Sequence, residues 1–140
     1  MTRDVVVANV SLPIAAAWTV LERERVRHLP VVEQGVLVGI VSDRDLLLTA
    51  SRADAGKLSF PDKVLGEIMS TAVVTCTANT SVAEAARLMI DKKIDALPVV
   101  AGSRLVGIVT STDLLGLLLE YAPAQSLPFD FRVEEIALVA

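Results

Sequence analysis

The sequence predicts an α+β fold in which two βαββα repeats pack about a pseudo-twofold axis. One basis is a block at residues 29–47 that reads as two short apolar strands and a polar helix start. The other is the return of this block, without a gap, at residues 97–115. Three residue pairs lie 68 positions apart: Pro30 and Pro98, Gly39 and Gly107, and Asp45 and Asp113. One copy is too short to bury both faces of its strands, so we expect the second copy to complete the core.

The elements of each copy follow from local patterns. In the first copy a β-branched run, a helix opened by Pro13 and two apolar runs predict strand, helix, strand, strand and helix, at 5–7, 13–26, 29–32, 36–41 and 43–51. The second copy repeats this order at 73–75, 81–93, 97–100, 105–109 and 111–121. A short helix is expected at 64–69, and Ser81 with Glu84 forms a capping-box pattern.

These elements divide the chain into four parts. They are repeat 1 (1–52), a linker (53–63), repeat 2 (64–121) and a C-terminal tail (122–140). The linker mixes small, charged and proline residues without a period. In the tail, 129–133 alternates like a strand, while 133–140 fits either a strand or a helix.

Composition and charge exclude several classes of protein. The 140 residues suit one compact body or two joined halves, and no stretch approaches the roughly 20 apolar residues of a membrane-spanning helix. The net charge of −4 argues against a nucleic-acid partner, because such binding depends on clustered Lys and Arg. The single cysteine, Cys76, cannot form an internal disulfide, and no signal-peptide pattern follows Met1. We therefore expect a cytoplasmic protein with no membrane partner.

The doubled pattern, with an Ala-rich helix upstream of each block, resembles a pair of CBS domains, the module named after cystathionine β-synthase. The match covers residues 5–47 and 69–119, and two full copies in register make it specific. The resemblance implies a βαββα unit in each half, a cleft for up to two adenosine-type ligands, and dimerisation of the helical faces into a disc. Nothing else in the chain resembles a catalytic or transport domain, so we expect a stand-alone pair or an excised regulatory segment.

Each copy starts its last helix with a hydroxyl and a carboxylate three residues apart, Ser42 with Asp45 and Thr110 with Asp113. In structural terms this is a capping box, which contributes about 0.5–2 kcal/mol and needs no ligand. In chemical terms, a helix N-terminus suits phosphate oxygens, and a carboxylate in its first turn can accept hydrogen bonds from both ribose hydroxyls. The family resemblance implies that this Asp binds ribose, so Asp45 and Asp113 are the leading site candidates.

The resemblance also implies that the base packs against the residues just before the Leu-Pro of the other copy. The site headed by Asp113 is expected to contain Thr110, Thr112, Ile108, Val26, Arg27, His28 and Val6. The site headed by Asp45 is expected to contain Ser42, Arg44, Ile40, Ile94, Asp95, Ala96 and Val74.

Charged side chains distinguish the two expected sites. Arg44 stands where the second copy has Thr112; its guanidinium could clamp a phosphate, although an exposed Arg in a first helical turn is an equally good interpretation. Arg27 and His28 would add positive charge at the Asp113 site, whereas Asp95 would repel phosphate at the Asp45 site. This difference favours the Asp113 site as the better nucleotide site.

The remaining patterns favour binding over catalysis. No nucleophile, base and orienting group occur together, and no Cys/His cluster has metal-ligand spacing, so neither an enzyme nor a metal site is expected. No cofactor is required, and AMP, ADP, ATP and S-adenosylmethionine are the candidate regulatory ligands.

The second helix of each copy predicts the assembly. It is apolar around most of its circumference, which one pair of repeats cannot cover, so a homodimer through helices is expected. The first hypothesis is a regulatory module that senses an adenine nucleotide or a related adenosyl compound and acts on an effector protein. The alternative is a structural dimerisation or partner-docking module without bound nucleotide.

Overall fold

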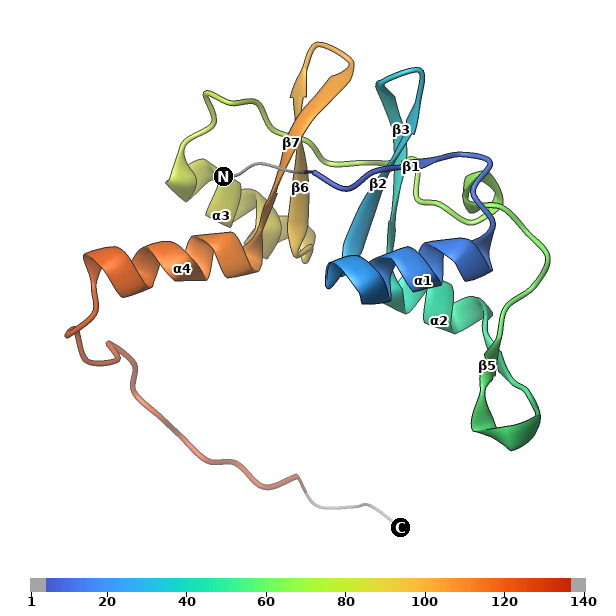
Figure 1. Cartoon of the computed structure of the whole chain (residues 1–140). Helices are drawn as coiled ribbons and strands as arrows, with labels where there is room; N and C mark the ends of the chain where they lie inside the picture. Colours follow the sequence, from blue (N-terminus) through green and yellow to red (C-terminus); the bar gives the residue numbers. More distant parts are fainter. Residues whose placement is uncertain (1–4, 137–140) are drawn as a thin grey trace.

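The computed structural model describes residues 5–136, which form two groups of strands and helices side by side (Figure 1). Repeat 1 contains β1 (Ala8–Asn9), α1 (Ile14–Glu24), β2 (His28–Glu33), β3 (Val36–Ser42) and α2 (Asp43–Thr49). Between α2 and the first long helix of repeat 2 lie β4 (Ser51–Arg52), η1 (Asp54–Gly56), β5 (Leu58–Ser59) and η2 (Leu65–Glu67). Repeat 2 contains α3 (Val82–Lys92), β6 (Ala96–Ala101), β7 (Arg104–Thr110) and α4 (Ser111–Tyr121). The predicted α+β fold is confirmed.

The two repeats meet at the tips of their β-hairpins, where a pseudo-twofold axis relates them (Figure 1). The main sheet has the order β1-β2-β3-β7-β6, and β3 pairs with β7 in the antiparallel direction through Val36 and Arg104, which are equivalent residues of the two copies. The flanking backbone hydrogen bonds are also equivalent: Leu37 N–H to the Ser103 carbonyl, 3.1 Å, and Leu105 N–H to the Gly35 carbonyl, 3.4 Å. Antiparallel pairing of equivalent residues is what a twofold axis generates, so the predicted packing is confirmed.

Buried side chains form two clusters, one per repeat, instead of one core completed by facing copies. The first contains Ala8, Ile14, Ala17, Leu21, Leu29, Val31, Val41, Leu46 and Leu65; the second contains Cys76, Ala85, Met89, Leu97 and Val99. Leu65 precedes the strands of repeat 2, yet it is fully buried in the first cluster, with Ile68 and Met69 packed beside it. Repeat 2 therefore supports the core of repeat 1 through one segment rather than through its sheet.

The predicted first strand of each copy is wrong in position. Residues 5–7 form no strand; β1 starts at Ala8, which pairs in parallel with Val31 of β2. Residues 73–75 also form no strand, and only the next residue, Cys76, makes a parallel bridge, to Val99. The apolar residues before both bridges line the pockets described below, which explains why they do not extend the sheet.

The other predicted elements begin and end within two residues of the observed ones, although the short helix at 64–69 is a 3-10 turn over Leu65–Glu67. The connector after α2, where no element was predicted, contains the small β4–β5 hairpin.

The tail does not form the strand that the alternating residues 129–133 suggest. Residues 122–136 contain neither helix nor strand, and 129–133 is exposed. Residues 1–4 of repeat 1 and 137–140 of the tail, which include part of the strand-or-helix alternative, lie outside the described residues. Among the helices of residues 5–136, none combines the length and hydropathy needed to cross a bilayer.

Candidate functional site

The starts of α2 and α4 carry the two capping boxes that the sequence predicts. Ser42 Oγ accepts a hydrogen bond from the Asp45 N–H at 3.1 Å, and Asp45 Oδ2 accepts one from the Ser42 N–H at 2.8 Å. Thr110 and Asp113 form the equivalent pair at 3.2 and 2.8 Å. Each cap uses the Oδ2 atom of its carboxylate. The hydrogen bonds of residues 5–136 use only Oδ2 of Asp45 and Asp113, which leaves Oδ1 of each carboxylate without a protein donor.

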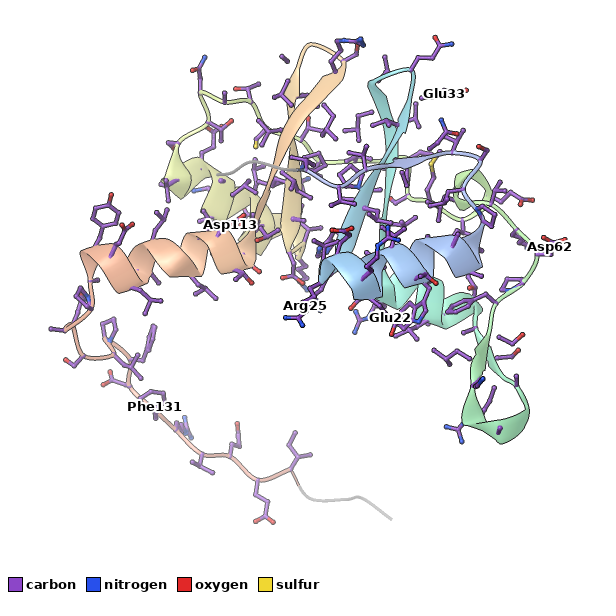
Figure 2. The ribbon with its side chains drawn as sticks, in the orientation of Figure 1. Glu22, Arg25, Glu33, Asp62, Asp113 and Phe131 are labelled. Carbon is purple, nitrogen blue, oxygen red and sulfur yellow. The ribbon has the colours of Figure 1, made fainter. Side chains whose placement is uncertain are left out.

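A pocket of about 520 Å³ opens beside Asp113, and we call it the Asp113 pocket. Figure 2 shows Asp113 at the start of α4 and Arg25 at the end of α1, on different repeats. The pocket is lined by Val5, Val6, Arg25, Val26, Arg27, His28, Asp95, Ile108, Thr110, Ser111, Thr112 and Asp113. The structure thus brings every residue expected at this site to one cavity, with the carboxylate from repeat 2 and the apolar wall mainly from repeat 1.

A second pocket of about 440 Å³, the Asp45 pocket, has the same construction with the repeats exchanged. Its carboxylate comes from repeat 1 and its opposite wall from repeat 2. Its lining includes all the residues expected there: Asp45, Ser42, Arg44, Ile40, Ile94, Asp95, Ala96 and Val74. Both pockets fall in the range of about 300–1,000 Å³ that is typical of small-molecule sites.

The charged wall between the pockets differs from the sequence-based expectation. Arg27, His28 and Asp95 each line both pockets, so they do not give the Asp113 site positive charge and the Asp45 site negative charge as expected. The reason is the pseudo-twofold packing, which places the starts of β2 and β6 on one wall that both pockets share. Arg27 is already paired on this wall, because its Nε lies 3.4 Å from Asp43 Oδ2.

His28 is half-buried on the shared wall and is held toward its neutral form. Burial lowers the pKa of His28 from its usual 6.5, and the Arg27 guanidinium lowers it further. Asp43, Asp95 and Asp45 oppose this shift of the pKa. A neutral imidazole both donates and accepts hydrogen bonds, which suits contact with a base edge or a phosphate on either side of the wall.

Several lining residues escaped the sequence reasoning. The Asp113 pocket also contains Val5, Arg25 and Ser111, and the Asp45 pocket also contains Val41, Asp43, Ser70, Ala72, Val73, Lys93 and Pro98. The 68-residue offset between the repeats places two basic residues, Arg25 and Lys93, at equivalent positions, and this is the signal that could have identified them. The same offset pairs Asp43 with Ser111, which marks a chemical difference between the two helix starts.

The remaining candidates for a functional group are Cys76 and a metal site. Cys76 is buried in the second cluster, and burial raises the pKa of its thiol, so it packs as a small apolar side chain. Among residues 5–136, no three His, Cys, Asp or Glu side chains come together in a way that could hold a metal ion.

Comparisons with known proteins agree with this architecture. The CBS domain family model matches residues 1–51 and 65–120. The CBS domain-containing protein YhcV of Bacillus subtilis is 36% identical over 115 residues, which cover 81% of this chain and 79% of YhcV.

Two solved structures resemble the whole pair. The CBS domain pair of protein MJ0100, in complex with 5′-methylthioadenosine and S-adenosyl-L-methionine, has a TM-score of 0.74 and 29% identity over 86% of this chain and 93% of that one. CBSX2, in complex with AMP, has a TM-score of 0.72 and 29% identity over 84% of this chain and 90% of that one. The family match in both repeats, joined to this common architecture, shows that the chain belongs to the CBS domain family and carries two CBS domains in tandem.

Proposed function

We propose that this chain is a regulatory module that binds an adenine nucleotide or a related adenosyl compound between its two CBS domains. The observation that carries the proposal is the construction of each pocket. A helix-start carboxylate with a free Oδ1 comes from one repeat, and an apolar wall of β-branched residues comes mainly from the other. A carboxylate can accept both ribose hydroxyls, and an apolar slot accommodates the base.

The named ligands of the relatives support this chemistry. The MJ0100 pair holds 5′-methylthioadenosine and S-adenosyl-L-methionine, and CBSX2 holds AMP. All three compounds share an adenosine core, which is the part that a carboxylate and an apolar slot recognise. We therefore assign Asp113 and Asp45 to the ribose, and Val26 with Ile108 and Ile94 with Ile40 to the base.

Ligand binding at these positions has a regulatory consequence. Because each pocket is built from both repeats, a bound ligand contacts both and favours their closed packing over looser arrangements. Ligand binding thereby stabilises one relative placement of α2 and α4, without any covalent bond being made or broken. We accordingly propose a binding protein and not an enzyme.

The outer surface of the helices supports a homodimer. Leu48 is 80% exposed on α2, and Leu115, Leu118 and Leu119 are 57–78% exposed on α4. In α4 no residue is fully buried. Leucines gathered on neighbouring turns are costly to leave in water, so we assign this face to a second copy of the chain. The same face favours the second candidate function, a dimerisation or partner-docking module that binds no nucleotide.

Thermal unfolding with AMP, ADP, ATP and S-adenosylmethionine tests the proposal. A ligand present at 100 times its Kd adds about 2.7 kcal/mol to the free energy of unfolding, which raises Tm by several degrees. We expect such a rise with at least one compound and its loss in the Asp45→Ala/Asp113→Ala double variant. If no compound changes Tm at millimolar concentration while the chain sediments as a dimer, the docking function replaces the regulatory one.

A further inference from the structure

Arg25 and Lys93 occupy equivalent positions of the two repeats and share an unusual backbone conformation. Each follows the last residue of its helix, α1 or α3, with φ near +55° in the left-handed region. Glycine is the usual residue at such a position, because it adopts a positive φ without a steric cost. The chain instead has a long basic side chain at both places. Residues held in sparsely populated backbone regions concentrate at functional sites, so the recurrence needs an explanation.

The pockets offer an explanation for these two basic residues, because each of them lines a cavity that is built from both repeats. Arg25 lines the Asp113 pocket and Lys93 lines the Asp45 pocket. Within residues 5–136 neither side chain forms an ion pair, whereas Arg27 is paired with Asp43. Of the two pockets, Arg44 lines the Asp45 pocket alone, and its counterpart in the Asp113 pocket is the uncharged Thr112. Arg25 and Lys93 are therefore the cations that the two pockets have in common at one equivalent position.

A simpler explanation is that a cation at this place only stabilises the C-terminal end of a helix. The last turn of each helix already has a basic residue, Arg23 in α1 and Lys92 in α3, and neither lines a pocket. The helix-end effect is thus available without a basic residue in the left-handed position. What Arg25 and Lys93 add is a positive charge in the pocket lining, supplied by the repeat that does not carry the capping carboxylate of that pocket.

We infer that Arg25 and Lys93 select for a 5′-phosphate on the ligand, so that both pockets prefer adenosine phosphates to uncharged adenosyl compounds. The inference rests on the proposed function and deepens it. Asp113 or Asp45 holds the ribose hydroxyls, and the basic residue from the opposite repeat binds the phosphate oxygens by charge-assisted hydrogen bonds. The selecting residue and the ribose-binding residue of each pocket thus come from different repeats, so a phosphorylated ligand bridges the repeats through its two polar ends.

Calorimetric titration with AMP and with adenosine tests this inference, because the two ligands differ only in the phosphate. The variants are Arg25→Gln, Lys93→Gln and the double variant. Gln34 shows that glutamine adopts a positive φ in this chain. Arg25→Gly and Lys93→Gly serve as second variants whose folding is not in question, because glycine relaxes at this position. Arg23→Gln and Lys92→Gln are the controls, with the same change of charge outside the pockets.

The expected result is that the wild-type chain binds AMP more tightly than adenosine. Each single variant loses this preference at one pocket, and the double variant binds the two ligands within a few-fold of each other. The loss in AMP affinity is about tenfold or more per site, as for a hydrogen bond to a charged group. Adenosine binding and both controls stay at the wild-type level.

Other results would overturn the inference. Variants that keep the wild-type ratio of AMP to adenosine affinity would show that these cations do not contact the phosphate. Equal weakening of both ligands would show an effect on pocket shape only. A wild-type chain that binds both ligands equally removes the inference and leaves the proposed function standing, whereas one that binds neither overturns the proposed function itself.

Discussion

Substitution of Asp113 separates the capping role of its carboxylate from the ribose-binding role that we propose for it, because stability and binding should respond differently. In Asp113→Ala the Thr110 N–H loses its 2.8 Å acceptor at the start of α4. Loss of a cap of this kind costs about 0.5–2 kcal/mol, which corresponds to a fall in Tm of about 2–6 °C for a chain of this size. Asp113→Asn keeps an amide oxygen that can accept the same hydrogen bond, so its stability should stay much closer to wild type.

The binding energies follow a different order. The carboxylate is expected to accept hydrogen bonds from the ribose, and one such bond to a charged group contributes about 1.5–3 kcal/mol. Both Asp113→Ala and Asp113→Asn should therefore weaken AMP binding at this pocket by roughly 10- to 150-fold in Kd. Urea unfolding measures the first effect and calorimetric titration the second.

Ser81→Ala provides a matched control for the loss of a cap. Ser81 caps α3, where its Oγ accepts from the Glu84 N–H at 3.1 Å, and it lines neither pocket. This variant should lose stability by a similar amount and bind AMP as the wild type does. If Asp113→Asn bound AMP with unchanged Kd, the carboxylate would act only as a helix cap, and the ribose assignment would be refuted.

Three further predictions concern other parts of the chain. Gly39→Ala should destabilise the fold by about 1–3 kcal/mol in urea unfolding, because a Cβ would collide with Met69 and lie 3.0 Å from the Ser70 carbonyl. The control Gly116→Ala places its Cβ in open space on α4 and should be neutral or stabilising. The pKa of His28 is lowered from 6.5 in the folded chain, so the unfolded chain takes up a proton more readily as the pH falls. The free energy of unfolding should therefore decrease from pH 7.5 to pH 5.5, and it should decrease less in His28→Gln. Leu118→Glu places a charge on the exposed face of α4 and should shift sedimentation from dimer to monomer, and an unchanged dimer would exclude this face as the interface.

Local chemistry explains how much of the fold the sequence predicted. The strands β2, β3, β6 and β7 and the helices that follow them rest on short apolar runs and on hydroxyl-to-carboxylate caps, which are set by residues within one or two turns of each other. The doubling of these patterns was sufficient to predict the pseudo-twofold axis. It also placed Asp45 and Asp113 at comparable positions, each in a pocket that faces the other repeat.

Tertiary relations account for what the sequence could not predict. The β-branched run at 5–7 has the composition of a strand, but its residues Val5 and Val6 line a pocket, and pairing with β2 starts only at Ala8. Arg27 and Asp95 were expected at different sites, and only the closeness of β2 and β6 across the axis puts both residues on one wall. The left-handed backbone at Arg25 depends on how α1 ends, and no residue type marks it in advance.

A crystal structure of the chain grown with saturating AMP is the decisive test of nucleotide binding between the two CBS domains. We expect density for one nucleotide in the Asp113 pocket, with the ribose hydroxyls within hydrogen-bond distance of the Asp113 carboxylate, the base between Val26 and Ile108, and the phosphate next to Arg25. We expect the equivalent pose on Asp45 in the second pocket. Nucleotide found only on the outer surface, or both pockets without nucleotide at saturation, would show that the repeats do not form a nucleotide site.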